Sequence, residues 1–302
     1  MTENTTAASG PRRTNPKKSA FDIQRTDGKH IIDVMIEERC PSFVKHWTWP
    51  VMRPLIFKAL SYKRAVRTAD ELIKLSGAES FDYLAEELDF TLDVHDLSRV
   101  PETGRCVVVA NHPTGLADGA AVWKTLRARR KDIIFFANAD AMRINPRFGE
   151  VTIPVEWVQE KRTPAKTRET LKLAGEAFAQ EMCIVIFPSG KLAKMIKGKF
   201  TEMEWFSTAI SLARKKNAPV IPLHIDARNS DLFYFVSKFS GELRDITLFR
   251  ELLNKKGSKF GMHFGPPLIP EKLTGDANEI TEQLKNHVAY TMAGDPHTPF
   301  QL

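Results

Sequence analysis

The sequence predicts an α/β fold with a mainly parallel central sheet flanked by helices, preceded by a helical N-terminal arm. From residue 105 onward, short apolar runs alternate with helical stretches, which is typical of βα units. Before that point, apolar residues recur at helical spacing. The 302 residues, 42% of them hydrophobic, suit one main domain of roughly 200–250 residues with an extension.

The chain divides into three predicted regions. Residues 1–20 hold four basic residues, one acidic residue and no apolar core, which predicts a disordered basic tail rather than a signal peptide. Residues 21–95 form the predicted helical arm, with a role in attachment to a membrane surface. Residues 96–302 form the predicted main domain.

In the arm, residues 47–64 place apolar side chains on one face of a predicted helix, at Met52, Leu55, Ile56, Ala59 and Leu60. Aromatic and cationic residues near its ends are typical of a helix at a lipid interface. A helix packed on the main domain is an equally good interpretation. The predicted membrane-contact residues are Trp47, Trp49, Phe57, Lys58, Tyr62 and Lys63. A second helix, residues 65–77, is predicted to end at Gly77.

The predicted strands of the main domain are residues 106–110, 133–137, 183–187, 219–225 and, more weakly, 259–264. Predicted helices cover residues 116–129 and 164–179, a segment that carries Trp205, Ala209 and Leu212, and residues 277–293. The longest apolar runs span five or six residues, whereas crossing a bilayer takes about 18. We therefore expect no membrane-spanning segment.

Composition limits the partners and the cellular location. The net charge of +7 indicates an acidic partner, either nucleic acid or an anionic membrane surface. Because no aromatic interleaving or nucleic-acid motif accompanies the basic clusters, we expect no nucleic acid and favour the membrane. The three cysteines show no CxxC spacing, which predicts no metal site and fits a reducing cytoplasm. The predicted location is cytoplasmic, peripheral to the inner face of the membrane.

Two polar turns follow predicted strands, "NHPTG" after residues 106–110 and "PSGK" after residues 183–187. In a parallel sheet such turns meet at the carboxyl edge, where ligands bind. On one helix, His112 and Asp118 would lie roughly 120° apart, so His112 must belong to the turn and Asp118 to the first helical turn. Asp118 then orients the imidazole, and the other ring nitrogen accepts a proton. The alternative is a histidine that merely caps the turn.

Four blocks resemble the glycerolipid acyltransferase superfamily, whose members acylate glycerol 3-phosphate, lysophosphatidate and other lysolipids. They are "NHPTGLADG" (111–119), residues 135–157, "IVIFPSGK" (184–191) and "APVIPL" (218–223). The resemblance implies that His112 is the general base, that Asp118 orients it, and that residues 96–302 are an acyltransferase domain. Five residues separate the pair instead of the usual four, which resembles the hemolysin-like and ornithine-lipid-related branches.

The resemblance implies an O-acyltransferase of membrane lipid biosynthesis. The donor is an acyl-carrier protein or coenzyme A thioester, no bound cofactor is needed, and a backbone donor near Gly190 stabilises the oxyanion. Ser189 replaces the family glutamate, and Leu192 and Trp157 stand at common arginine positions, so the lysolipid acceptor is either lysophosphatidate-like or a lyso-aminolipid. The predicted substrate-binding residues are Asn111, Thr114, Gly115, Arg143, Pro188, Ser189, Gly190 and Lys191.

An apolar groove for the acyl chain is expected along residues 233–239 or along the N-terminal helices. Two alternative functions remain open at this point. One is a lipid-binding protein of the same fold without turnover, and the other is a hydrolase that uses the same pair to activate water.

Overall fold

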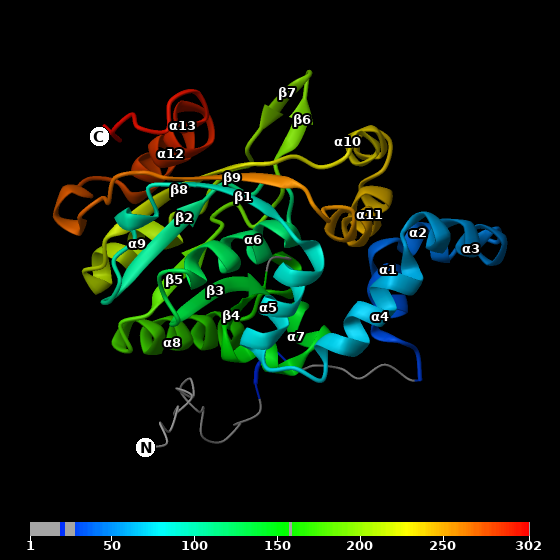
Figure 1. The fold of residues 1–302 in the computed structure, drawn as a ribbon. Helices are drawn as coiled ribbons and strands as arrows, with labels where there is room; N and C mark the ends of the chain where they lie inside the picture. The colour runs from blue at the N-terminus through cyan, green and yellow to red at the C-terminus, as the bar shows by residue number, and fades with distance from the viewer. Residues whose placement is uncertain (1–18, 22–27, 157–158, 302) are drawn as a thin grey trace, which may run out of the picture.

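The computed structural model describes residues 19–21, 28–156 and 159–301. Residues 1–18 of the predicted tail, and Trp157, lie outside the described residues. Within them, a seven-stranded sheet forms the centre of the molecule (Figure 1). In spatial order its strands are β1 (Thr91–His95), β9 (Lys259–Phe264), β8 (Val220–Asp226), β2 (Cys106–Ala110), β5 (Cys183–Ile186), β3 (Ile133–Asn138) and β4 (Thr152–Val155).

All neighbouring strands are parallel except β8 and β9, which confirms the predicted mainly parallel sheet. The five predicted strands are present. β1 and β4 were missed, as was the hairpin of β6 (Lys194–Ile196) and β7 (Lys199–Thr201). Both missed strands of the large sheet lie at its edges, where fewer apolar residues are needed.

Helices cover both faces of the sheet. Cys106, Val108 and Ala110 pack on one face and Val107 and Val109 on the other, because side chains alternate along a strand. The first face is covered by α5 (Gly77–Leu88) and α6 (Leu116–Arg127), and the second by α8 (Pro164–Ala179), α9 (Thr208–Lys216) and α12 (Ala277–Asn286). The central strand is therefore buried on both sides, which explains its continuous apolar run.

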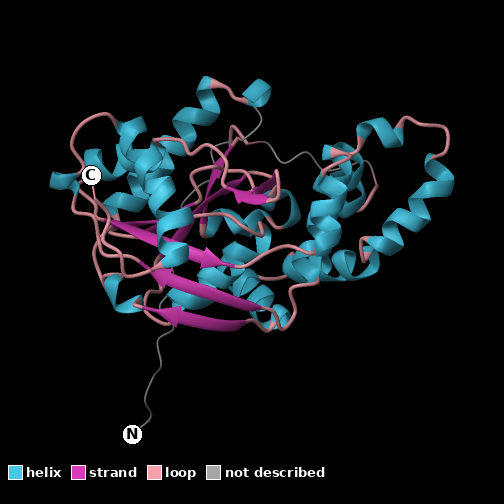
Figure 2. Ribbon diagram, turned by 90° about the horizontal axis from the view of Figure 1, so that it is seen from above, coloured by secondary structure: helices cyan, strands magenta, loops and turns pink. Residues whose placement is uncertain are grey.

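The remaining helices surround this core. They are α1 (Ile31–Arg39), α2 (Pro41–Val44), α3 (Trp49–Ala59), α4 (Tyr62–Leu72), α7 (Ala141–Ile144), α10 (Asp231–Ser237), α11 (Gly241–Leu253) and α13 (Met292–Gly294). Helices α1 to α4 pack with α11 around a separate apolar cluster. Figure 2 shows this arm projecting beyond the sheet.

Three predictions about element boundaries were wrong. The helix expected at residues 47–64 is broken at Ser61, whose φ of 57° is left-handed, so α3 and α4 are separate. Gly77 begins α5 instead of ending the helix before it. Glycine is needed at this position because a Cβ would lie 2.4 Å from the Arg147 carbonyl oxygen. Trp205 precedes α9.

The boundary expected at residue 95 also differs from the structure. The strand Thr91–His95 pairs with β9 in the main sheet, and α5 packs against α6. The part of the arm that stands apart from the sheet is therefore α1 to α4.

Candidate active site

His112 and Asp118 are in contact at the carboxyl end of β2. His112 lies in the turn after the strand, and Asp118 lies in the first turn of α6. The distance from His112 Nδ1 to Asp118 Oδ2 is 2.9 Å. Because a carboxyl oxygen accepts this hydrogen bond, Nδ1 carries the proton and Nε2 is left as an acceptor. This is the arrangement that the spacing argument predicted.

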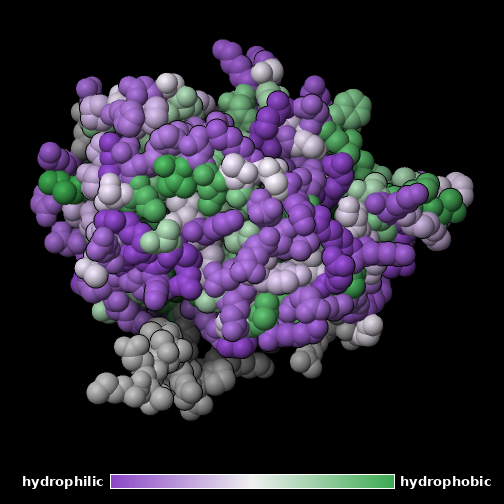
Figure 3. Space-filling model, in the orientation of Figure 1, coloured by the Kyte–Doolittle hydropathy of each residue, from purple (hydrophilic) through white to green (hydrophobic). Residues whose placement is uncertain are grey.

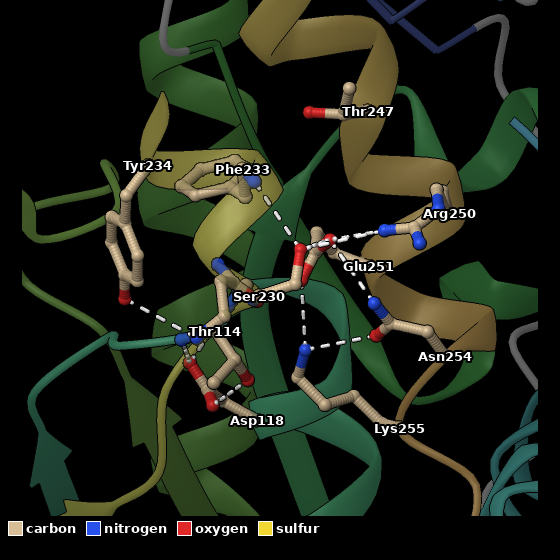
Figure 4. A network of polar contacts seen from close by, with 12 residues as sticks. Thr114, Asp118, Ser230, Phe233, Tyr234, Thr247, Arg250, Glu251, Asn254 and Lys255 are labelled. Atoms are coloured by element: carbon tan, nitrogen blue, oxygen red, sulfur yellow. Dashed lines mark hydrogen bonds and ion pairs between the residues drawn. The ribbon is translucent and has the colours of Figure 1, made fainter. Parts of the chain in front are cut away.

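Asp118 is fully buried and is held by the turn that precedes it. Its Oδ2 accepts hydrogen bonds from the backbone N–H groups of Thr114 and Gly115, both at 2.9 Å. Its Oδ1 accepts one from the Thr114 hydroxyl. Figure 4 shows Thr114 and Asp118 turned toward each other. Thr114 therefore positions the aspartate, and its predicted contact with substrate stays a prediction.

The two predicted turns are in contact with each other. The His112 ring stacks on Phe187, with centroids 4.3 Å apart, and Ala193 N donates to His112 O. Gly115 has a φ of 92°, and a Cβ there would lie 3.0 Å from Leu192 Cδ2. Phe187 was not predicted as a site residue, although it stands directly before the "PSGK" turn.

Asn111 links the end of β2 to the end of β8. Its Nδ2 donates to Ile225 O at 3.0 Å, and its Oδ1 accepts from Ile225 N at 2.7 Å. Both ends of the buried amide are therefore used by the backbone. Asn111 fixes the exit of the chain from β2, and its role in substrate binding stays a prediction.

The polar groups of the second turn, "PSGK", mostly form hydrogen bonds within the turn or with the residue before it. The buried Ser189 hydroxyl donates to Lys191 O at 2.6 Å, and Gly190 N donates to Phe187 O at 3.0 Å. The Ser189 hydroxyl and the Gly190 N–H are therefore both engaged within the turn, and an oxyanion donor near Gly190 stays a prediction. Pro188 is buried, and its carbonyl accepts from Phe206 N. Only Lys191 presents an exposed side chain.

Arg143 does not face the turns as predicted. Its guanidinium donates to both carboxyl oxygens of Glu38, at 2.6 and 2.8 Å, and to Asp140 at 3.3 Å. The Arg143 hydrogen bond lowers the pKa of Glu38. Arg143 therefore joins α1 to α7, and two carboxyl groups already balance its charge.

A cavity of about 770 Å³ opens beside His112. Gly115, Phe187, Gly190 and Lys191 line it near the turns, and its lining extends to apolar residues of α1, α4 and α11. Residues 233, 234, 237 and 238 line it as well, so both segments expected to form an apolar groove contribute. Its size is typical of a ligand site.

Helix α10 is anchored over this cavity by buried polar contacts (Figure 4). Ser230 caps the helix, and its hydroxyl and backbone N–H both donate to Glu251 of α11. Lys255 pairs with Glu251 at 3.0 Å. Burial raises the pKa of Glu251, but Ser230 and Lys255 outweigh this effect and lower it overall. The network fixes Tyr234, whose hydroxyl accepts from Asn229 N.

The predicted membrane-contact residues divide into two groups. Trp49 and Phe57 are buried in the arm's own cluster, and Tyr62 stacks on Phe57. Trp47, Lys58 and Lys63 are exposed. Figure 3 shows hydrophobic residues at the tip of the projecting arm, where α3 lies. The large exposed hydrophobic residues there are Trp47, Val51, Met52 and Leu55.

The described part of the chain contains no helix long and apolar enough to span a bilayer. It also contains no group of three or more histidine, cysteine or acidic side chains that could hold a metal ion. His224 is buried and hydrogen-bonded to Val288 O at 2.8 Å.

The chain is similar to known acyltransferases. The family model described as acyltransferase matches residues 91–226. A lyso-glycine lipid O-acyltransferase from Phocaeicola vulgatus is 26% identical over 64% of this chain and 69% of its own length. One from Bacteroides thetaiotaomicron is 23% identical over 64% of this chain and 71% of its own length. The crystal structure of a 1-acyl-sn-glycerophosphate acyltransferase from Thermotoga maritima covers 87% of this chain and 97% of that one, with 15% identity and a TM-score of 0.46.

Proposed function

Because the chain is an acyltransferase of the glycerolipid acyltransferase superfamily, we propose that it moves a fatty acyl group from a thioester to the free hydroxyl of a lysolipid. The thioester belongs to an acyl-carrier protein or to coenzyme A. The observation that carries this proposal is the contact between His112 and Asp118 beside a large apolar cavity. A radiolabelled acyl-transfer assay of the wild type and of a His112 variant tests it.

His112 is the proposed general base. Its Nε2 accepts the proton of the acceptor hydroxyl while the hydroxyl oxygen attacks the thioester carbonyl carbon. The tetrahedral intermediate then collapses, the carbon–sulfur bond breaks, and the leaving sulfur takes the proton from His112. Asp118 keeps the imidazole in the required tautomer and stabilises it while it is protonated.

The proposed acceptor is a lysolipid built on an N-acylated amino acid. Both curated relatives described above are named for a lyso-glycine lipid. In addition, the charge of Arg143, one of the predicted substrate-binding residues, is already balanced by Glu38 and Asp140, so it is not available to a phosphomonoester. A buried phosphate dianion without such partners is very costly. Both observations favour a headgroup without phosphate.

The apolar cavity is the proposed site of an acyl chain, and Ala69 of α4 lines it. Replacement of Ala69 by phenylalanine places a phenyl ring in the cavity. We expect kcat/KM for the longest accepted chain to fall about tenfold, because overpacking costs roughly 1–3 kcal/mol. Kinetics with a series of acyl donors of increasing length measure this effect. The shortest donor is the internal control, and an equal loss at every length would argue against the cavity as the chain site.

The tip of the arm is the proposed contact with the cytoplasmic face of the membrane. Val51 and Leu55 of α3 are 71% and 68% exposed. From Arg39 to Ala69, both included, the chain has seven lysines and arginines and no acidic residue. An apolar surface with adjacent cations suits anionic lipids.

Replacement of both Val51 and Leu55 by serine is expected to weaken vesicle binding at least about tenfold, because each exposed apolar side chain contributes roughly 1.5–3 kcal/mol when it is buried in lipid. Flotation with vesicles of phosphatidylcholine and phosphatidylglycerol measures the bound fraction. Leu171→Ser, which removes an equally apolar exposed side chain from α8, is the matched control and should bind like the wild type. Equal loss in both variants would contradict a docking role for α3.

A further inference from the structure

A second cavity, of about 470 Å³, lies next to the same turn and has a more polar lining. Asn111 lines it, whereas its neighbour His112 lines the apolar cavity, and Met195 and Tyr234 line both. Glu202, His224, Arg228 and Tyr290 contribute polar side chains. A second, more polar cavity therefore adjoins the turn that carries the proposed base.

Glu202 is the unusual residue of this second cavity. It is only 5% exposed, and its Oε1 accepts a hydrogen bond from Trp205 Nε1 at 3.2 Å. Its backbone N–H donates to the Tyr290 hydroxyl at 3.0 Å. Its Oε2 is buried and has no hydrogen-bond partner among the residues that the structure describes. A buried polar atom without a partner costs free energy, so its retention calls for an explanation.

Electrostatics also connect Glu202 with the proposed catalytic residues. Burial raises the pKa of the Glu202 carboxyl, while the Trp205 indole and the neighbouring His112 act in the opposite direction. Asp118 raises it further. Glu202 is therefore close enough to the pair to respond to the charge on each member, and the His112 backbone N–H also acts on its carboxyl as a donor. No hydrogen bond of normal geometry reaches Oε2 among the described residues.

We propose that the second cavity is the headgroup site of the acceptor, and that Glu202 Oε2 accepts a hydrogen bond from the amide N–H of an N-acylated amino-acid lysolipid. This rests on the proposed function. A carboxyl oxygen needs a donor, and an amide N–H supplies one without adding charge. A phosphomonoester has no amide N–H for Oε2, and with up to two negative charges it is repelled by Glu202 more strongly than a single carboxylate is. Arg228 also lines the cavity. Its ion pair with Asp231 is exposed and therefore weak, so its guanidinium can turn to the carboxylate of such a headgroup.

The test compares three acceptors. The first is an N-(3-hydroxyacyl)glycine, the second is its ester analogue with oxygen in place of the amide N–H, and the third is lysophosphatidate. We expect the wild type to prefer the amide over the ester at least about 30-fold in kcat/KM, chiefly through KM. Lysophosphatidate is expected to be a poorer acceptor than the amide. Glu202→Met removes the hydrogen-bond acceptor, and we expect it to reduce the preference for the amide to about threefold or less.

Glu204→Met is the matched control, because Glu204 is two residues away and exposed. It should keep the preference of the wild type. If Glu202→Met does not fold, Glu202→Gln keeps the shape of the side chain and is expected to reduce the preference at least about threefold, because the charge-assisted hydrogen bond is lost.

The outcomes separate the two proposals. Equal use of amide and ester by the wild type would overturn the role of Glu202 while acyl transfer to lysolipids still holds. An unchanged preference in the folded Glu202 variant would do the same, as would a clear preference of the wild type for lysophosphatidate. Acyl transfer to none of the three acceptors would instead overturn the proposed function.

Discussion

Replacement of His112 by alanine is expected to lower the rate of acyl transfer at least about 100-fold, which is the usual contribution of a general base. Without the imidazole, the acceptor hydroxyl has no group beside it to take its proton. The measurement is transfer of a radiolabelled acyl group to the lysolipid under saturating donor. His297→Ala is the control, because His297 is exposed and pairs only with Asp96 in the structure.

Two other outcomes would support the alternative functions. Lipid binding that is intact in both proteins, with no transfer in either, would indicate a lipid-binding protein of this fold. Free fatty acid released by the wild type in the absence of acceptor, at the rate of transfer, would indicate a hydrolase. In that case His112 would activate water, and His112→Ala would abolish the release.

Replacement of Asp118 by asparagine is expected to reduce acyl transfer by about 100-fold or more and to destabilise the protein by about 3 kcal/mol. The fully buried carboxyl group accepts hydrogen bonds from His112, Thr114 and Gly115, all of which are donors. An asparagine NH₂ group turned toward any of them faces another donor, and the imidazole loses its fixed tautomer. Initial rates and thermal unfolding measure the two effects.

Thr114→Val separates the loss of activity from the loss of stability. It removes only the hydroxyl bond to Asp118 and leaves the backbone bond in place. We expect about a tenfold loss of rate, intermediate between the wild type and Asp118→Asn, because one hydrogen bond is lost. A Thr114→Val protein as inactive as Asp118→Asn would argue that the turn, and not the carboxyl group, determines the activity.

Much of the central sheet could be predicted from local patterns. The run at residues 106–110 is continuous because β2 is buried on both faces, and a pattern of that kind identifies an interior strand. The contact between His112 and Asp118 followed from helix geometry, since only a turn could bring the two residues together. Both inferences depend on residues close together in the sequence.

The errors arose where a distant part of the chain decides the outcome. Gly77 follows a helical pattern, as a glycine at the end of a helix does. The Arg147 carbonyl, seventy residues later, instead requires a glycine at the start of α5. Arg143 was predicted to bind substrate. Its ion-pair partner Glu38 lies on a helix far away in the sequence, so local patterns could not reveal the pair. Ser189 and Gly190 were assigned correctly to a turn, yet their polar groups are used to build the turn itself.

Asn111 determines how firmly His112, the proposed catalytic base, is held. A residue one position beyond a strand would ordinarily share the mobility of the loop that follows. Here the side-chain amide pairs with both backbone groups of Ile225, and so adds one more rung to the ladder between β2 and β8. The thermal displacement of the imidazole is then governed by the stiffness of the sheet, and the base moves with the scaffold as a single body.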